Sequence, residues 1–105
     1  MAACRAFSAA AANAAWDKVP NFYEILTQQP GKASWPITGA SFILLHANAE
    51  KPERTEEVLK FFDWAFKNGD KLALDLDYVP LPVAVKDQVR NAWKGVTDNA
   101  GKPIF

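Results

Sequence analysis

The sequence predicts an α/β fold in which most of the chain is helical and the helices pack on one or two strands. Residues 40–45 form a nearly continuous apolar run, which is typical of a strand covered on both faces. Residues 52–68 repeat apolar side chains at helical spacing, and a second helical stripe follows Pro82. With 105 residues the chain has the length of one domain, so we expect residues 1–105 to belong to a single domain.

The first third of the chain predicts a helix, an extended segment and a turn. Residues 7–15 are rich in alanine, the best helix former, and the stretch 17–21 with its proline ends that helix. Aromatic and branched side chains in residues 22–27 indicate an extended segment or strand. In residues 28–31, Pro and Gly are placed as in a type II turn.

Residues 34–46 predict a change of direction followed by a strand. Pro36 biases Trp35 toward extended backbone, and Gly39 permits a sharp bend. We expect the apolar residues that follow to lie in the centre of a sheet.

A long helix is expected to begin near Pro52, which suits a first-turn position. Its predicted buried stripe contains Val58, Phe61, Phe62 and Ala65. Gly69 is expected to end it as a left-handed cap.

Residues 71–78 fit a strand and a helix equally well, because their leucines alternate and also share a helical face. A last helix is predicted to open at Pro82 and to stop at Gly95. Its apolar stripe is Val85, Val89, Ala92 and Trp93.

Composition excludes several classes of function. Twelve basic and twelve acidic residues give a net charge of zero, which offers no electrostatic basis for nucleic-acid binding. A single cysteine excludes an internal disulfide and disfavours a cysteine-based zinc site. The alanine-rich start is too polar for the apolar core of a signal peptide, so we expect no export signal in this sequence.

Three segments carry a resemblance to a known family. They are residues 34–46, residues 58–69 with the run Phe-Phe-Asp-Trp-Ala, and residues 76–82 followed by 89–93. Their order and spacing resemble the C-terminal portion of periplasmic phosphate-binding proteins, the substrate-binding components of phosphate ABC transporters. The resemblance covers about residues 7–105.

The resemblance implies a partial lobe of a type II periplasmic-binding-protein fold, in which a hinge joins two lobes around phosphate. The family's phosphate ligands lie on earlier parts of the chain, so no phosphate-binding residue is expected here. Residues 34–46 correspond to the hinge strand that returns into lobe one. Trp35, Pro36, Thr38 and Gly39 are therefore expected beside the hinge, and residues 71–77 are expected to be helical.

The same resemblance implies a fragment of a phosphate uptake system that does not bind phosphate by itself. Its partners in the family are inorganic phosphate and the ABC permease, and its location is the periplasm. An alternative is a small self-associating module. A lobe without its early strands leaves residues 41–45 with an unpaired edge, which favours a homo-oligomer or a domain swap.

No motif predicts catalysis or a cofactor. His46 is the sole histidine and has no cysteine beside it with which to bind a metal. Asp75 and Asp77 point apart on a helix, and Ser41 lacks a partner base. We expect Trp64 and Trp93 to pack in the core rather than stack on a ligand. The sequence therefore predicts a protein that is not an enzyme and holds no metal.

Overall fold

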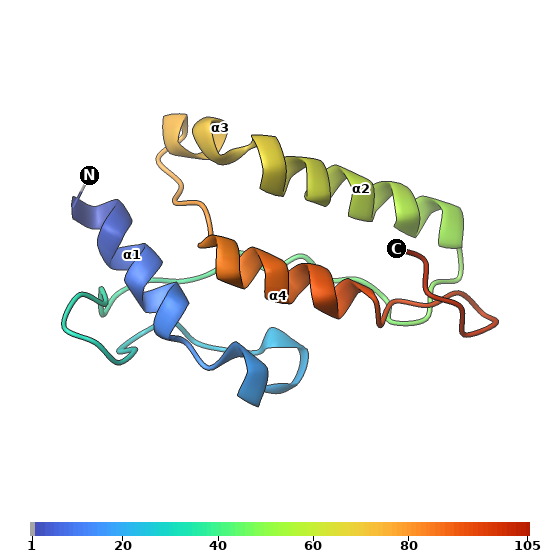
Figure 1. Cartoon of the computed structure of the whole chain (residues 1–105), viewed down its shortest axis with the longest axis horizontal. Coiled ribbons are helices and arrows are strands. Elements are labelled where there is room, and N and C mark those ends of the chain that lie inside the picture. Colours follow the sequence, from blue (N-terminus) through green and yellow to red (C-terminus); the bar gives the residue numbers. More distant parts are fainter. Residues whose placement is uncertain (1) are drawn as a thin grey trace. The chain divides into compact units, whose positions relative to one another are not determined.

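The computed structural model describes residues 2–105, with side-chain surroundings from Arg5 onward. The elements in order are α1 (Ala2–Asn13), the 3₁₀ turns η1 (Trp16–Lys18) and η2 (Pro20–Phe22), α2 (Pro52–Asn68), α3 (Asp70–Asp75) and α4 (Val83–Trp93) (Figure 1). The chain forms two compact units. The first takes the chain as far as Phe42 together with Val79–Val85, and the second takes Ile43–Tyr78 and Lys86–Phe105.

The first unit is built around a small apolar core. Ala11, Trp16, Leu26 and Val85 are buried together, and Phe7, Phe22 and Leu81 pack against them. The indole Nε1 of Trp16 donates a hydrogen bond to the carbonyl of Ala11 at 2.7 Å. This bond satisfies the polar atom that burial of a tryptophan removes from water.

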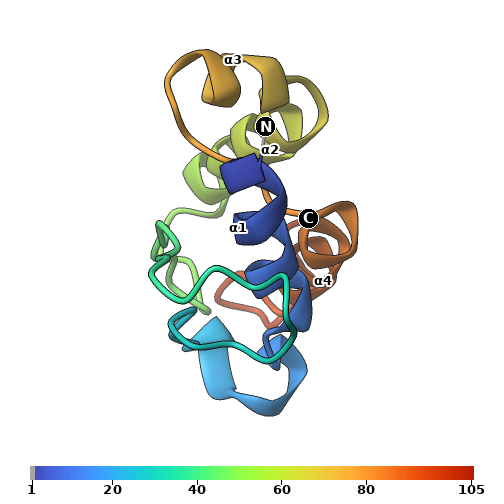
Figure 2. The ribbon, with the colours of Figure 1, turned by 90° about the vertical axis from the view of Figure 1, so that its left-hand side faces the viewer.

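The predicted helix at the start of the chain is confirmed, although it ends at Asn13. For residues 22–27 the sequence predicted an extended segment or a strand, and the structure forms no strand there. Asn21 and Phe22 have positive φ values of 55° and 56°, which are not helical angles and reverse the direction of the chain at η2. The chain then loops back beside α1 (Figure 2). Burial of Leu26 in the cluster with Trp16, and not pairing with another strand, holds this segment in place.

The turn around residues 28–31 is present, and Gly31 adopts φ +102°, a value that favours glycine. The backbone N–H of Gln28 donates to the carbonyl of Pro36 at 3.2 Å, which closes the loop.

The central strand expected at residues 40–46 does not form within the described part of this chain. This segment has no regular secondary structure, and from Ser41 to His46 every residue is exposed, with Leu44 90% exposed. Among residues 2–105, the structure has two isolated backbone bridges, Asn48 with Thr97 and Thr97 with Pro103. A β-strand is defined by hydrogen bonds to a neighbouring strand. An apolar run without such a neighbour therefore stays irregular.

The second unit contains the long helix α2 beside α4 (Figure 1). Pro52 at its start and Glu53 in its first turn confirm the predicted N-terminus. The predicted buried stripe needs correction. Leu59 is completely buried, whereas Val58 and Phe61 are exposed. The helix is apolar on more than one side, and periodicity alone does not say which side is covered.

The left-handed cap expected at Gly69 is wrong. Gly69 has right-handed helical angles, φ −88° and ψ −6°, and leads directly into α3. Glycine is still required, since a Cβ there would lie 2.6 Å from the carbonyl oxygen of Ala65. The helical conformation expected for residues 71–77 is confirmed as far as Asp75.

The helix predicted after Pro82 is confirmed as α4. Val85 and Trp93 of its predicted stripe are buried, but Ala92 is exposed. Trp64, expected in the core, is also exposed. No helix within residues 2–105 combines the length and the hydropathy that a membrane crossing needs.

Candidate functional site

The four residues predicted beside a hinge lie in one irregular segment of the first unit. Trp35, Pro36 and Gly39 are exposed and Thr38 is partly buried. The chain bends at Pro36 and Ile37. Nothing lies within 4 Å of a Cβ built on Gly39. The segment is therefore exposed at Pro36, Ile37 and Gly39 and partly buried at Thr38.

A hydrogen-bond clamp fixes the chain just before that segment. The side-chain Nδ2 of Asn13 donates to the carbonyl of Pro30 at 2.9 Å and to Ser34 Oγ at 3.1 Å. Ser34 Oγ donates to the same carbonyl at 2.6 Å. A Cβ on Gly31 would come within 2.7 Å of the Asn13 amide, so the clamp needs glycine there.

Backbone bonding continues the clamp to Trp35, whose N–H donates to the carbonyl of Ala6 at 3.1 Å. Residues 28–36 are thus tied to α1 at two points, near the middle of the helix at Ala6 and at its C-terminal end at Asn13 (Figure 2). Sequence reasoning missed Asn13 and Ser34, which lie 21 positions apart. The Pro-Gly turn between them was the one feature of the local sequence that pointed to this clamp.

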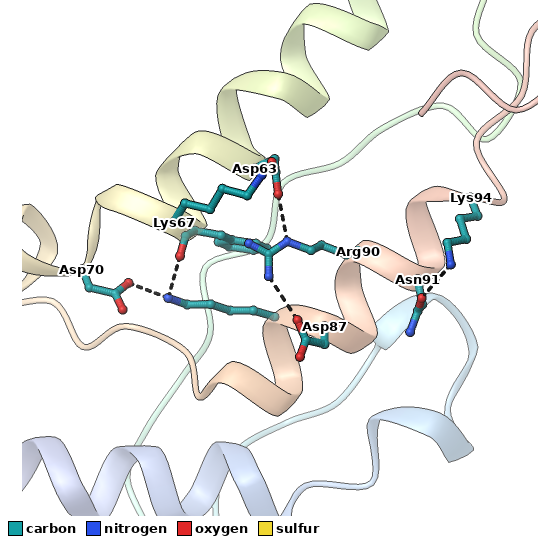
Figure 3. Close-up of polar contacts among 9 residues, drawn as sticks. Asp63, Lys67, Asp70, Asp87, Arg90, Asn91 and Lys94 are labelled. Carbon is teal, nitrogen blue, oxygen red and sulfur yellow. Dashed lines mark hydrogen bonds and ion pairs between the residues drawn. The ribbon is translucent and has the colours of Figure 1, made fainter.

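The second unit holds a network of charged side chains where α2, α3 and α4 meet (Figure 3). Lys86 is the buried member, with 4% of its surface exposed. Its Nζ donates to the carbonyl of Phe66 at 3.0 Å and to Asp70 Oδ1 at 2.5 Å. Phe66 is in the last turn of α2, where carbonyls lack helical partners, and Asp70 opens α3. One ammonium group therefore joins the end of one helix to the start of the next.

Asp63 of α2 and Arg90 of α4 form the second part of the network (Figure 3). Arg90 Nε lies 2.8 Å from Asp63 Oδ1, and Arg90 Nη1 lies 3.1 Å from Asp87 Oδ1. Lys67 also binds Asp63. Hydrogen bonds from Lys67 and Arg90 hold the pKa of the Asp63 carboxyl below its ordinary value. Hydrogen bonding to Asp63 raises the pKa of Arg90.

An aromatic stack lies beside these charges. The rings of Phe66 and Trp93 are parallel within 10° with centroids 5.7 Å apart, and Phe105 meets Trp93 edge-on. The guanidinium of Arg90 lies 5.6 Å from the centroid of the Phe66 ring, within cation–π range. The spacing of Lys86, Arg90 and Trp93 along one helix was the signal from which this arrangement could have been found.

The chemistry of this network is that of a helix junction. Each cation in it already faces a carboxylate, so the junction has no surplus positive charge to attract an anion. No group of three or more His, Cys, Asp or Glu side chains that could hold a metal ion occurs in the described part of the chain. His46, the sole histidine, is exposed. What the network does is hold α2 and α4 together.

Comparison of the sequence with curated proteins finds several relatives that carry the same name. The phosphate-binding protein PstS of Pasteurella multocida (strain Pm70) is 52% identical over 100 residues, which is 94% of this chain and 29% of that protein. PstS of Haemophilus influenzae is 49% identical over 88 residues, 84% of this chain and 26% of that protein. PstS of Xylella fastidiosa (strain 9a5c) is 40% identical over 87 residues, 83% of this chain and 24% of that protein. No family model matches the chain. The chain spans about a quarter of the length of these relatives.

Proposed function

Because this chain matches a C-terminal portion of the phosphate-binding protein PstS, we propose that it is the scaffold part of a receptor in a phosphate uptake system. The observation that carries the proposal is the match itself, which extends over nearly the whole chain with about half of the residues identical. The resemblance in residues 34–46 and 58–69 agrees with it. The relatives are named as binding proteins, and the chain is accordingly a binding-protein component and not an enzyme.

This part of the receptor does not bind phosphate alone. Capture of an anion away from water needs several converging donors, such as backbone amides at a helix start and an arginine. The three cations of the helix junction, Lys67, Lys86 and Arg90, are already bound to carboxylates. The phosphate ligands of the receptor lie, in this proposal, in the three quarters of the relatives' length outside this match.

The fold of the proposed receptor is a type II periplasmic-binding-protein fold, of which residues 1–105 form part of a lobe. The exposed apolar residues Phe42, Ile43 and Leu44 support this proposal. Neighbouring strands would give this segment both hydrogen-bond partners and cover for its two faces. Residues 34–46 would then be the strand that returns from the hinge into lobe one.

Trp35, Pro36, Thr38 and Gly39 are the hinge-adjacent residues in this proposal. A hinge needs a fixed side and a side that can rotate. The clamp of Asn13 on Pro30 and Ser34 provides a fixed side, and Gly39, with open space around it, provides freedom. The receptor would work in the periplasm and deliver inorganic phosphate to an ABC permease.

Titration calorimetry and thermal melting of the 105-residue chain with inorganic phosphate test this proposal. We expect no heat of binding and no change in Tm at about 1 mM phosphate, which is about a thousand times a micromolar Kd. Full-length PstS of Pasteurella multocida, measured under the same conditions, is the positive control. A saturable heat with a rise of Tm in the short chain would overturn the scaffold proposal.

A second candidate function is a small self-associating module. Large apolar side chains of the second unit are exposed, including Phe61, Trp64 and Leu72. Burial of such a surface in a homo-oligomer, or by a domain swap through residues 41–45, is favourable. Sizing of the chain by light scattering over a range of concentrations tests this candidate, and a monomer throughout would exclude it.

A further inference from the structure

Asn68 and Gly69, where α2 ends, form the only Asn-Gly pair in the sequence. The side chain of Asn68 is exposed, and its Nδ2 donates to the carbonyl of Trp64 at 3.0 Å. An asparagine followed by glycine is especially prone to deamidation, because glycine has no side chain to hinder attack by its own backbone nitrogen. We propose that Asn68 is a deamidation site that the folded chain keeps closed and that Lys86 controls.

The reaction at this site is intramolecular. The backbone nitrogen of Gly69 loses its proton to base and attacks Cγ of the Asn68 side chain. A nitrogen–carbon bond forms, the side-chain amide leaves as ammonia, and a cyclic imide remains. Water then opens the ring at either of its carbonyls, which gives aspartate or isoaspartate at position 68. The chain and water supply all the atoms, and no electrons are exchanged.

Hydrogen bonds close this site in the folded chain. The N–H of Gly69 donates to the carbonyl of Ala65 at 2.8 Å, so the attacking nitrogen is held in a helical hydrogen bond. The N–H of Ala73 donates to the carbonyl of Gly69 at 2.9 Å, which continues the helical path into α3. Ring closure breaks the bond to Ala65 and the side-chain bond to Trp64. The reaction therefore requires local opening of the joint between α2 and α3.

Lys86 of α4 holds this joint on both sides of Asn68. Its Nζ donates to the carbonyl of Phe66, two residues before Asn68, and to Asp70 Oδ1, two residues after it, at 3.0 and 2.5 Å (Figure 3). Lys86 is only 4% exposed, so water does not readily replace these bonds. Opening at Asn68 moves Phe66 relative to Asp70 and costs at least one of them. Lys86 therefore raises the free energy of opening.

Either product would prevent the joint from closing as before. Both carry a carboxylate in place of the amide, so the Trp64 carbonyl loses its side-chain donor. A negative charge at the C-terminal end of α2 is also unfavourable, because the helix dipole is negative there. Isoaspartate adds a carbon atom to the backbone, which takes the N–H of Gly69 out of register with Ala65. A transient opening is thereby converted into a permanent change.

The test is peptide mapping by mass spectrometry of the full 105-residue chain during incubation under mildly alkaline conditions. Conversion of Asn68 should be at least about a hundredfold slower in the folded wild type than in the same chain unfolded in guanidinium chloride, because only opened molecules react. Lys86→Ala should react about tenfold faster than the folded wild type. The rate follows the population of the open form when opening and closing are fast, and this variant loses a buried charged hydrogen-bond donor.

Two further variants complete the experiment. Lys71→Ala is the matched control, because it removes an exposed lysine three residues from Asn68 whose bond to Asp75 lies within α3. Its rate should stay within about twofold of the wild type. Asp70→Ala removes the carboxylate partner of Lys86 at an exposed position, where the fold tolerates change, and should accelerate the reaction about threefold.

Each outcome bears on a separate part of the proposal. An unfolded chain that does not react at Asn68 would overturn the site itself. Equal rates in the folded and the unfolded wild type would overturn the protection by the fold. Folded Lys86→Ala and Asp70→Ala that react at the wild-type rate, or Lys71→Ala that reacts as fast as Lys86→Ala, would overturn the control by Lys86. Should Lys86→Ala not fold, Asp70→Ala against Lys71→Ala decides this last point.

Discussion

Asp63 and Arg90 join α2 to α4 through a charge-assisted hydrogen bond in which Arg90 Nε lies 2.8 Å from Asp63 Oδ1. Both side chains are only partly exposed, and Phe66 lies under the guanidinium. Partial burial limits screening by solvent, so this bond contributes more than the surface pairs on α2 do. The contact also sets the helix pair in register with the Phe66–Trp93 stack.

The Asp63 carboxyl should make stability depend on pH in the acid range. Its pKa in the folded chain is lowered from the ordinary 3.8 by hydrogen bonds from Lys67 and Arg90. A lowered folded-state pKa contributes stability that is present above pH ~4 to 5 and is lost as the pH falls through the folded pKa. Urea unfolding between pH 2 and 7 should therefore show a steeper acid loss in the wild type than in Asp63→Asn. Parallel pH curves for the two proteins would contradict this prediction.

Removal of the buried ammonium group should destabilise the junction of α2 and α3. Lys86→Ala leaves the Phe66 carbonyl without its side-chain donor and Asp70 without its cation. An unsatisfied polar group in a buried position costs about 1–3 kcal/mol. Lys94→Ala is the control, because Lys94 is exposed and binds Asn91 within its own helix. Equal urea midpoints for the two variants would show that Lys86 has no role in the junction.

A matched pair of leucines tests the position of the core. Leu59 is completely buried and Leu44 is 90% exposed. Leu59→Ala should lower the free energy of unfolding by about 2–5 kcal/mol, because it removes buried methyl groups and leaves a cavity. Leu44→Ala should stay within about 0.5 kcal/mol of the wild type. Chemical denaturation measures both, and a large loss at Leu44 would mean that this segment is covered in solution.

Two glycines test the clamp on residues 28–36. Gly31→Ala forces a side chain into φ +102° and places its Cβ 2.7 Å from the Asn13 amide. We expect a loss of at least about 1 kcal/mol and release of the Asn13 bonds. Gly39→Ala meets no atom within 4 Å and needs no positive φ, so it should be neutral or stabilising by up to about 1 kcal/mol. Denaturation midpoints check the energies, and amide exchange at Trp35 checks the clamp.

Local patterns in the sequence determined the helices of this protein. Pro52, the glutamates after it and the repeating apolar residues predicted α2, and Pro82 with Val85 and Trp93 predicted α4. These signals act between residues three or four positions apart. The resemblance to phosphate-binding proteins correctly resolved the segment at Lys71 as helical, where alternation of leucines alone left two possibilities.

Tertiary structure alone decided which apolar side chains are covered. The run from Phe42 to Leu45 has the composition of a central strand, but a strand needs a partner, and no paired strand forms within residues 2–105. The same reason explains why Leu59 is buried while Phe61 is not, and why Asp63 meets Arg90 across 27 positions. Periodicity assigns a residue to a side of a helix, whereas burial depends on what the rest of the chain places against that side.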